Sequence, residues 1–293
     1  MKGIILAGGS GTRLYPTTQI VCKQLLPIYD KPMIYYPLST LMQAGIRDVL
    51  IISTPQDIPH FVNLFKDGSH LGMNISYEIQ LEPKGIPEAF TIGESFIGSD
   101  NVCLILGDNI FYGNSFPDIL RACVNRVNNK VVDGGTVFCY YVADARQYGV
   151  AEIEDYKVIS LEEKPEHPKS NWAVTGLYLY TNDVIEVSRS LQPSARGETE
   201  ITAVNQVYLE EDRLTAEYLG RGFSWIDTGS PSALVEASSF IKIIEERKGM
   251  KIGCIEEIAF TEGFITEAQY VEIIEPIKNS PYGKYLLKVL DFI

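Results

Sequence analysis

A glycine-rich stretch near the N-terminus is the first segment whose residue types could do chemistry. It reads Gly8, Gly9, Ser10, Gly11, Thr12 and Arg13. Glycines let a backbone turn sharply and bring its N–H groups close to an anion, and the guanidinium fork of arginine suits phosphate oxygens. The spacing does not fit a Walker loop, and Leu14 stands where the dinucleotide-binding fingerprint needs a third glycine. The stretch indicates a phosphate-binding loop, with a ligand-free strand-to-helix turn as the alternative.

Carboxylates and one ammonium supply further candidates. Asp108 follows an apolar run at 101–106, and Asp227 ends the stretch 223–227. Mg²⁺ is usually held by one or two carboxylates together with substrate phosphate oxygens. Each aspartate could also be an ordinary turn residue, and two positions so far apart cannot be paired by spacing. Glu163 and Lys164 could bind sugar hydroxyls and a phosphate, although such a pair is more often a solvated charge run.

The elements that would position these residues alternate between strands and helices. We predict buried strands at 2–7 and 48–53, further strands at 74–80 and 101–106, and helices at 31–44, 58–65 and about 87–96. This alternation is typical of a parallel sheet with crossover helices. Ligands of such sheets bind at the carboxyl ends of the strands, where the glycine loop, Gln80 and Asp108 stand. The sequence therefore predicts an α/β fold, Rossmann-like, with a mixed and mostly parallel sheet and flanking helices.

The second half of the chain predicts additions to this core. We expect a hairpin near 151–163, a strand at 171–180 and a helix capped by Thr199. An amphipathic helix at 231–248 should end at Gly249, and short helices should follow. These segments give a core at 1–229, with a small sugar-binding β insertion at about 140–222, and a helical segment at 230–293 packed on it.

Composition limits the function classes. The 293 residues carry a net charge of −13, which argues against a nucleic-acid surface because phosphate backbones select basic faces. The five cysteines lack metal-ligand spacing, and their odd number without a signal peptide fits a reducing cytoplasm. No apolar run is long enough to cross a membrane. We expect a cytoplasmic enzyme that acts on small molecules.

The segment from 8 to 38 resembles the sugar-phosphate nucleotidylyltransferases. The family pattern G-G-x-G-T-R-L-x-P-x-T, then K-x-L-x-P and K-P-M-I, is present in order, and G-D-N, E-K-P and W-x-D-T-G follow at 107–109, 163–165 and 225–229. The tail, with 283–287, resembles the short-form thymidylyltransferases of this family. The resemblance implies Mg²⁺-dependent transfer from dTTP to α-D-glucose 1-phosphate, giving dTDP-glucose and pyrophosphate, the first step of dTDP-sugar biosynthesis of the dTDP-rhamnose type.

The resemblance also implies a role for individual residues. The catalytic group would be Arg13 on the triphosphate, Lys23 beside the reacting phosphates, Lys164 on the sugar phosphate, and Asp108 and Asp227 sharing one Mg²⁺. The nucleotide would be bound by Gly8, Gly9, Gly11, Thr12, Arg13, Gln24, Gln80, Gly85 and Asp108. The sugar phosphate would be bound by Tyr141, Gly149, Glu163, Lys164, Val174, Gly176, Glu198 and Thr202. Gln80 and Gly85 would read the pyrimidine edge, because a glutamine amide offers a donor and an acceptor together.

One departure from the family leaves the base preference open. The segment 81–88 differs from the thymidylyltransferase pattern, and Lys84 stands where an aspartate is usual. Thymidine is our prediction, and uridine is the alternative. A non-catalytic regulatory subunit that binds nucleotide sugar is a further alternative, disfavoured because Arg13, Lys23 and both aspartates are present. The resemblance also implies a homotetramer with a second site at which a dTDP-sugar end product inhibits.

Overall fold

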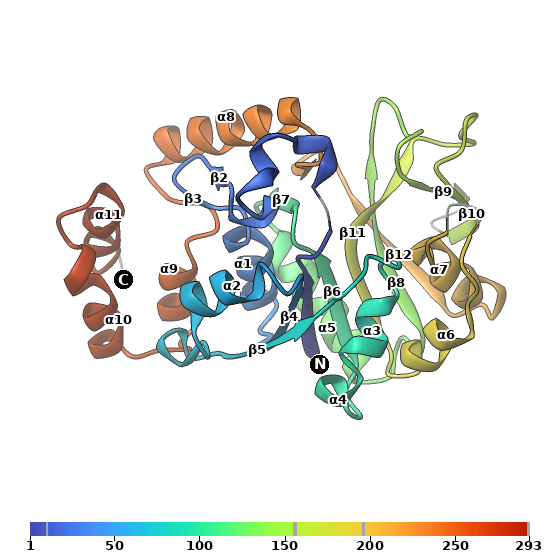
Figure 1. Cartoon of the computed structure of the whole chain (residues 1–293), viewed down its shortest axis with the longest axis horizontal. Helices are drawn as coiled ribbons and strands as arrows, with labels where there is room; N and C mark the ends of the chain where they lie inside the picture. Colours follow the sequence, from blue (N-terminus) through green and yellow to red (C-terminus); the bar gives the residue numbers. More distant parts are fainter. Residues whose placement is uncertain (10, 155–156, 195–196, 292–293) are drawn as a thin grey trace.

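The computed structural model describes residues 1–9, 11–154, 157–194 and 197–291. Nine strands of this described part form one mixed sheet in the order β10-β9-β11-β6-β1-β4-β5, with β8 paired to β11 and β12 (Figure 1). Their bounds are β1 Lys2–Leu6, β4 Asp48–Ser53, β5 Asn74–Ile79, β6 Val102–Leu106, β8 Gly135–Tyr141, β9 Gly149–Glu154, β10 Lys157–Glu163, β11 Trp172–Tyr180 and β12 Leu214–Leu219. Two short pairs stand apart, β2 Pro27–Ile28 with β3 Lys31–Pro32, and β7 Asn109–Gly113 with β13 Phe223–Asp227.

The first half of the sheet is parallel, and its inner strands β1, β4 and β6 are buried on both faces. β1 pairs in parallel with β4 and β6, and β4 pairs in parallel with β5. β1, β4 and β6 are nearly continuous apolar runs, and Ile4 and Ile5, which point to opposite faces, are both fully buried. The edge strand β5 is mostly exposed. β11 then runs antiparallel to β6, β8 and β9. The predicted α/β class, with a mixed and mostly parallel sheet, is confirmed.

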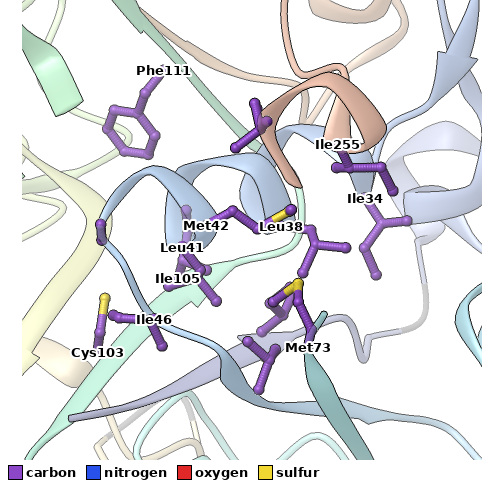
Figure 2. Close-up of a cluster of buried hydrophobic side chains, with 14 of the residues drawn as sticks. Ile34, Leu38, Leu41, Met42, Ile46, Met73, Cys103, Ile105, Phe111 and Ile255 are labelled. Atoms are coloured by element: carbon purple, nitrogen blue, oxygen red, sulfur yellow. The ribbon is translucent and has the colours of Figure 1, made fainter. Parts of the chain in front are cut away.

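Helices cover both faces of the sheet. One face packs against α1 Tyr35–Gln43, α2 Ile58–Phe65, α5 Phe116–Asn128 and the C-terminal helices. Figure 2 shows Leu38, Leu41 and Met42 around α1, packed with Ile105 of the sheet and Ile255 of the C-terminal segment. The other face packs against α3 Glu88–Ile92, α4 Glu94–Ile97, α6 Val184–Ser190 and α7 Ile201–Glu210. Two apolar layers therefore hold the strand ends at fixed positions.

The C-terminal segment is helical. It comprises α8 Pro231–Lys248, α9 Ile255–Thr261, α10 Glu267–Ile274 and α11 Pro281–Val289. Ser230 caps α8 by accepting from the amide of Ala233 at 3.2 Å, and Gly249, at φ 68°, ends it. Tyr270 and Leu286 are fully buried in the main core, so α10 and α11 pack on the same body although they lie at the end of the molecule far from β9 and β10 (Figure 1). None of the described helices is both long and apolar enough to span a bilayer.

Three local expectations differ from the structure. The helix expected from Lys31 begins at Tyr35, because Lys31 lies in β3 and its ammonium is 2.9 Å from Glu245 Oε1 on α8. The helix expected at 87–96 is divided at Gly93 into α3 and α4. Thr199 does not cap α7; the N-cap position is Glu200, without a side-chain cap, and the amide of Thr199 donates to the carbonyl of Lys84 at 2.8 Å.

Candidate active site

The glycine loop after β1 forms one wall of a cavity of about 230 Å³. Gly9 and Gly11 have φ of 111° and 58°, which favours glycine at both positions. The cavity is lined by Gly8, Gly9, Gly11, Thr12, Arg13, Leu14, Lys23, Gln24, Asp108 and Gly229. Ser10 lies outside the described residues. The cations predicted to meet a triphosphate, Arg13 and Lys23, thus share one cavity with the loop and with Asp108.

Asp108 is held from several directions where β6 leads into β7. Its carboxylate forms an ion pair with Lys23 and accepts from Asn109 Nδ2 at 2.9 Å. Its carbonyl accepts from both the amide and the hydroxyl of Thr228, at 3.1 and 2.8 Å. Thr228 follows β13, so these bonds fix the end of that strand against Asp108.

Strand pairing brings the second aspartate beside the first. β13 runs antiparallel to β7, and Asp227 lies opposite Asn109. Burial, then the charge of Asp108, raises the pKa of Asp227 to about 6, against the lowering effect of Lys23 and Arg13. A buried carboxylate whose pKa is raised by a neighbouring carboxylate fits a divalent cation, whose charge would relieve the repulsion. In the described part of the chain, no group of three or more His, Cys, Asp or Glu gathers as a metal site. Magnesium bound here would take its remaining ligands from substrate oxygens and water.

A second cavity, of about 120 Å³, opens on the other side of this pair. It is lined by Ile86, Leu106, Asn109, Gln147, Tyr148, Gly149, Glu163, Lys164, Val174, Gly176, Tyr178, Ile201, Thr202, Trp225 and Asp227. Glu163 Oε2 accepts from the Thr202 hydroxyl at 2.5 Å, and Glu163 Oε1 lies 3.2 Å from Lys164 Nζ. Lys164 adopts φ 45°, and its amide donates to the carbonyl of Tyr148 at 3.0 Å. A carboxylate and an ammonium therefore face the same small cavity.

Asn109 joins the two sides of the site. Its Oδ1 accepts from the Gly176 amide at 3.1 Å and from Trp225 Nε1 at 2.6 Å, while its Nδ2 donates to Asp108. The asparagine is buried, and its amide orientation is fixed because an amide N–H and an indole N–H can only donate. One side chain thus connects β7, β11 and β13 with Asp108, the residue just before β7, and β13 ends with Asp227.

Comparison with known proteins gives the family of this chain. The pattern of the nucleotidyl transferase family matches residues 2–243. The chain is 52% identical over 291 residues to the glucose-1-phosphate thymidylyltransferase of Neisseria meningitidis serogroup A, and 53% identical over 292 residues to that of Mycobacterium tuberculosis; each alignment covers 99% of both sequences. The chain belongs to the glucose-1-phosphate thymidylyltransferase family of nucleotidyl transferases.

Solved structures of nucleotidyl transferases share the fold. A glucose-1-phosphate thymidylyltransferase structure from Bacillus anthracis, in complex with sucrose, superposes with a TM-score of 0.75 at 40% identity, covering 82% of this chain and 94% of that one. A UDP-glucose pyrophosphorylase structure in complex with UDP-glucose gives a TM-score of 0.72 at 27% identity, covering 83% of this chain and 98% of that one.

The remaining predicted residues of this nucleotidyl transferase lie in different surroundings. Gln80 is buried against Gly8, and Gly85, at φ 118°, pairs with Thr199. Tyr141 lies outside both cavities of the site, in a separate cavity with Trp172, its ring centroid 5.5 Å from that of the tryptophan.

Glu198 is exposed and lines neither cavity. The sugar-phosphate roles of Tyr141 and Glu198 therefore receive no support from their positions.

Among the lining residues of the transferase site that sequence reasoning missed, three have side chains that shape the second cavity. Tyr148 and Trp225 stack edge to face at 5.1 Å between ring centroids on one side of the second cavity. Asn109 is the hub described above. Each lies within two residues of a predicted position: Asn109 follows Asp108, Tyr148 precedes Gly149, and Trp225 lies two residues before Asp227. This closeness in the sequence is the signal that could have identified them.

Proposed function

We propose that this enzyme transfers the thymidylyl group of dTTP to α-D-glucose 1-phosphate, giving dTDP-glucose and pyrophosphate. The proposal rests on one observation. The cavity lined by the glycine loop contains Asp108, the cavity lined by Glu163 and Lys164 contains Asp227, and Asp227 pairs across β7 and β13 with Asn109, the residue next to Asp108. Phosphates bound in the two cavities would therefore lie next to each other at the two carboxylates.

The chemistry needs positioning and charge neutralisation more than proton transfer. A phosphate oxygen of glucose 1-phosphate attacks the α-phosphorus, and a new P–O bond forms. The bond from the α-phosphorus to the bridging oxygen breaks, and its electron pair leaves with pyrophosphate. Because the attacking oxygen is already ionised, no general base is required.

Different residues of this chain would neutralise the negative charges of the two substrates. Arg13 and Lys23 line the first cavity and would bind the triphosphate, and Lys164 would hold the sugar phosphate. Asp108 and Asp227 would hold Mg²⁺, which when bound neutralises charge on the reacting phosphates. The pairing of Lys23 with Asp108 keeps the ammonium at the point where the two cavities meet.

Sugar recognition would come from Glu163 and its neighbours. The Thr202 hydroxyl donates to Glu163 Oε2, so the carboxylate is held in place where it lines the cavity, and sugar hydroxyls are donors that suit it. Tyr148 and Trp225 offer ring faces against which a hexose can pack. A Cβ on Gly149 would lie 3.1 Å from Thr202 Oγ1, so the glycine keeps this wall open.

The test is pyrophosphate release with glucose 1-phosphate and Mg²⁺, with dTTP, UTP, ATP, CTP and GTP compared in parallel. We expect release with dTTP, lost in Asp108→Asn and kept in Asp118→Asn, whose side chain is 82% exposed on α5. A clear preference for UTP would make UTP the substrate instead of dTTP. The altered segment 81–88 is the reason for testing this alternative. If none of the five nucleotides gives pyrophosphate release, the non-catalytic regulatory subunit would be favoured.

We further propose a cytoplasmic homotetramer that starts dTDP-sugar synthesis of the dTDP-rhamnose type and is inhibited by a dTDP-sugar end product. A cavity of about 340 Å³, which shares no lining residue with the two above, supports an inhibitory site because Lys248 lines it and its ammonium is suited to a diphosphate. Sedimentation should give a tetramer, and Lys248→Ala should weaken inhibition without lowering the uninhibited rate. A monomer, or unchanged inhibition in the variant, would contradict these two proposals respectively.

A further inference from the structure

Gln80 lies beside Gly8, which lines the nucleotide cavity, and its side chain has a defined orientation. It follows β5, is 6% exposed, and its amide donates to the Ser53 carbonyl at 2.8 Å. A Cβ built on Gly8 would lie 2.6 Å from Gln80 Oε1, so this oxygen points at the glycine loop. Among the residues that the structure describes, no hydrogen bond occupies Oε1. An acceptor therefore faces the place where a nucleotide enters.

The other end of the Gln80 amide is held by Glu88, the first residue of α3. Glu88 Oε2 accepts from Gln80 Nε2 at 2.7 Å and from the backbone amide of Lys84 at 3.4 Å. A carboxylate has no hydrogen to donate, so it can face only the nitrogen of the Gln80 amide. Reversing that amide would set Oε1 against Oε2, two acceptors with no hydrogen between them.

We propose that Glu88 is a positioning residue that locks the Gln80 amide and so restricts the enzyme to bases with a ring N–H at the pairing edge. The inference rests on the proposed function, because it assigns base selection to the nucleotide site named there. Gln80 would contact the base, and Glu88 would act only through Gln80.

The hydrogen-bond pattern explains the selection. Thymine and uracil present N3–H between two carbonyls, so Gln80 Oε1 can accept from N3 while the second hydrogen of Nε2 donates to a carbonyl. Cytosine presents an acceptor at N3 and a donor at its amino group, which requires the reversed amide. That reversal would break the bond to Glu88. The lock therefore rejects cytosine and does not distinguish thymine from uracil.

The experiment measures equilibrium binding of dTTP and dCTP by calorimetry in the wild type, Glu88→Gln and Glu82→Gln. A glutamine at 88 can face either end of the Gln80 amide. We expect the dCTP-to-dTTP ratio of Kd to fall by about 10- to 100-fold in Glu88→Gln, the worth of one hydrogen bond to a charged group. Glu82 is the matched control, because its side chain is 72% exposed and, among the described residues, forms an ion pair only with the exposed Lys84 at 3.5 Å. Glu88→Ala should change the ratio in the same direction.

The outcomes separate the inference from the proposed function. An unchanged ratio in both Glu88 variants, or equal loss of affinity for both nucleotides, would overturn the lock and leave a structural role. Equal affinities in the wild type would overturn it as well. A wild type that prefers dTTP and loses the preference in Glu88→Gln, but releases no pyrophosphate with glucose 1-phosphate, would support the lock and overturn the proposed reaction.

Discussion

Replacing Asn109 by alanine should weaken both the fold and the reaction. The substitution removes the acceptor of two donors, the Gly176 amide and Trp225 Nε1, and the donor that orients Asp108. Gly176 is buried and Trp225 is 9% exposed, so water replaces the lost acceptor poorly. The variant tests the claim that one side chain couples the carboxylate pair to the sugar cavity.

The size of the effect follows from the number of orphaned groups. Each buried donor left without a partner costs about 1–3 kcal/mol, so two cost about 2–6 kcal/mol of the free energy of unfolding. With an unfolding entropy of about 2.1 cal/mol/K per residue, the Tm of a 293-residue chain should fall by about 3–10 °C. The loss of the Asp108 contact should also lower kcat.

Calorimetric unfolding and pyrophosphate release measure the two effects separately. Asn114→Ala is the control, because this asparagine is exposed just after β7 and should change neither quantity. If Asn109→Ala unfolds at the wild-type temperature with the wild-type kcat, the coupling assigned to Asn109 is wrong. A lower Tm with unchanged kcat would limit the residue to a structural role.

Three further predictions test other parts of the site. Thr202→Val removes the donor to Glu163, and KM for glucose 1-phosphate should rise about 5- to 10-fold with KM for dTTP unchanged, a shift of about 1 kcal/mol; equal changes in both constants would count against a sugar-side role. Gly8→Ala places a Cβ 2.6 Å from Gln80 Oε1, so dTTP affinity should fall while glucose 1-phosphate affinity holds, and unaltered dTTP binding would show that Gln80 does not face the base. Chelation by EDTA should stop pyrophosphate release reversibly with no change in Tm, because only two protein carboxylates are assigned to Mg²⁺; turnover that persists in EDTA would refute the metal role.

The sequence predicts best what depends on local pattern. The strand Asp48–Ser53, the helix Ile58–Phe65 and the helix Pro231–Lys248 have the predicted bounds, because apolar periodicity and the stop at Gly249 are read within each segment. The glycine loop, Arg13 and the end of β6 also lie together as the rule for parallel strands requires.

Tertiary contacts account for what the sequence does not predict. Lys31 lies outside the expected helix and forms an ion pair with Glu245. Because Glu245 is far along the chain, no local sequence pattern predicts this pair. The neighbourhood of Asp108 and Asp227 follows from the antiparallel register of β7 and β13, which no spacing encodes. Tyr141 is the last residue of β8, a strand of the core, but its side chain lines the separate cavity at Trp172 and not the site. Side-chain direction at a strand end is decided by the neighbouring strands.

The most direct test of the central claim is mass spectrometry of the products formed from dTTP, glucose 1-phosphate and Mg²⁺. The account predicts dTDP-glucose and pyrophosphate in equal amounts, and neither product from Asp227→Asn. Pyrophosphate without a nucleotide sugar would mean that water is the acceptor and that the cavity at Glu163 does not bind the sugar phosphate. No product with dTTP, under conditions in which the protein is folded, would contradict the proposed reaction.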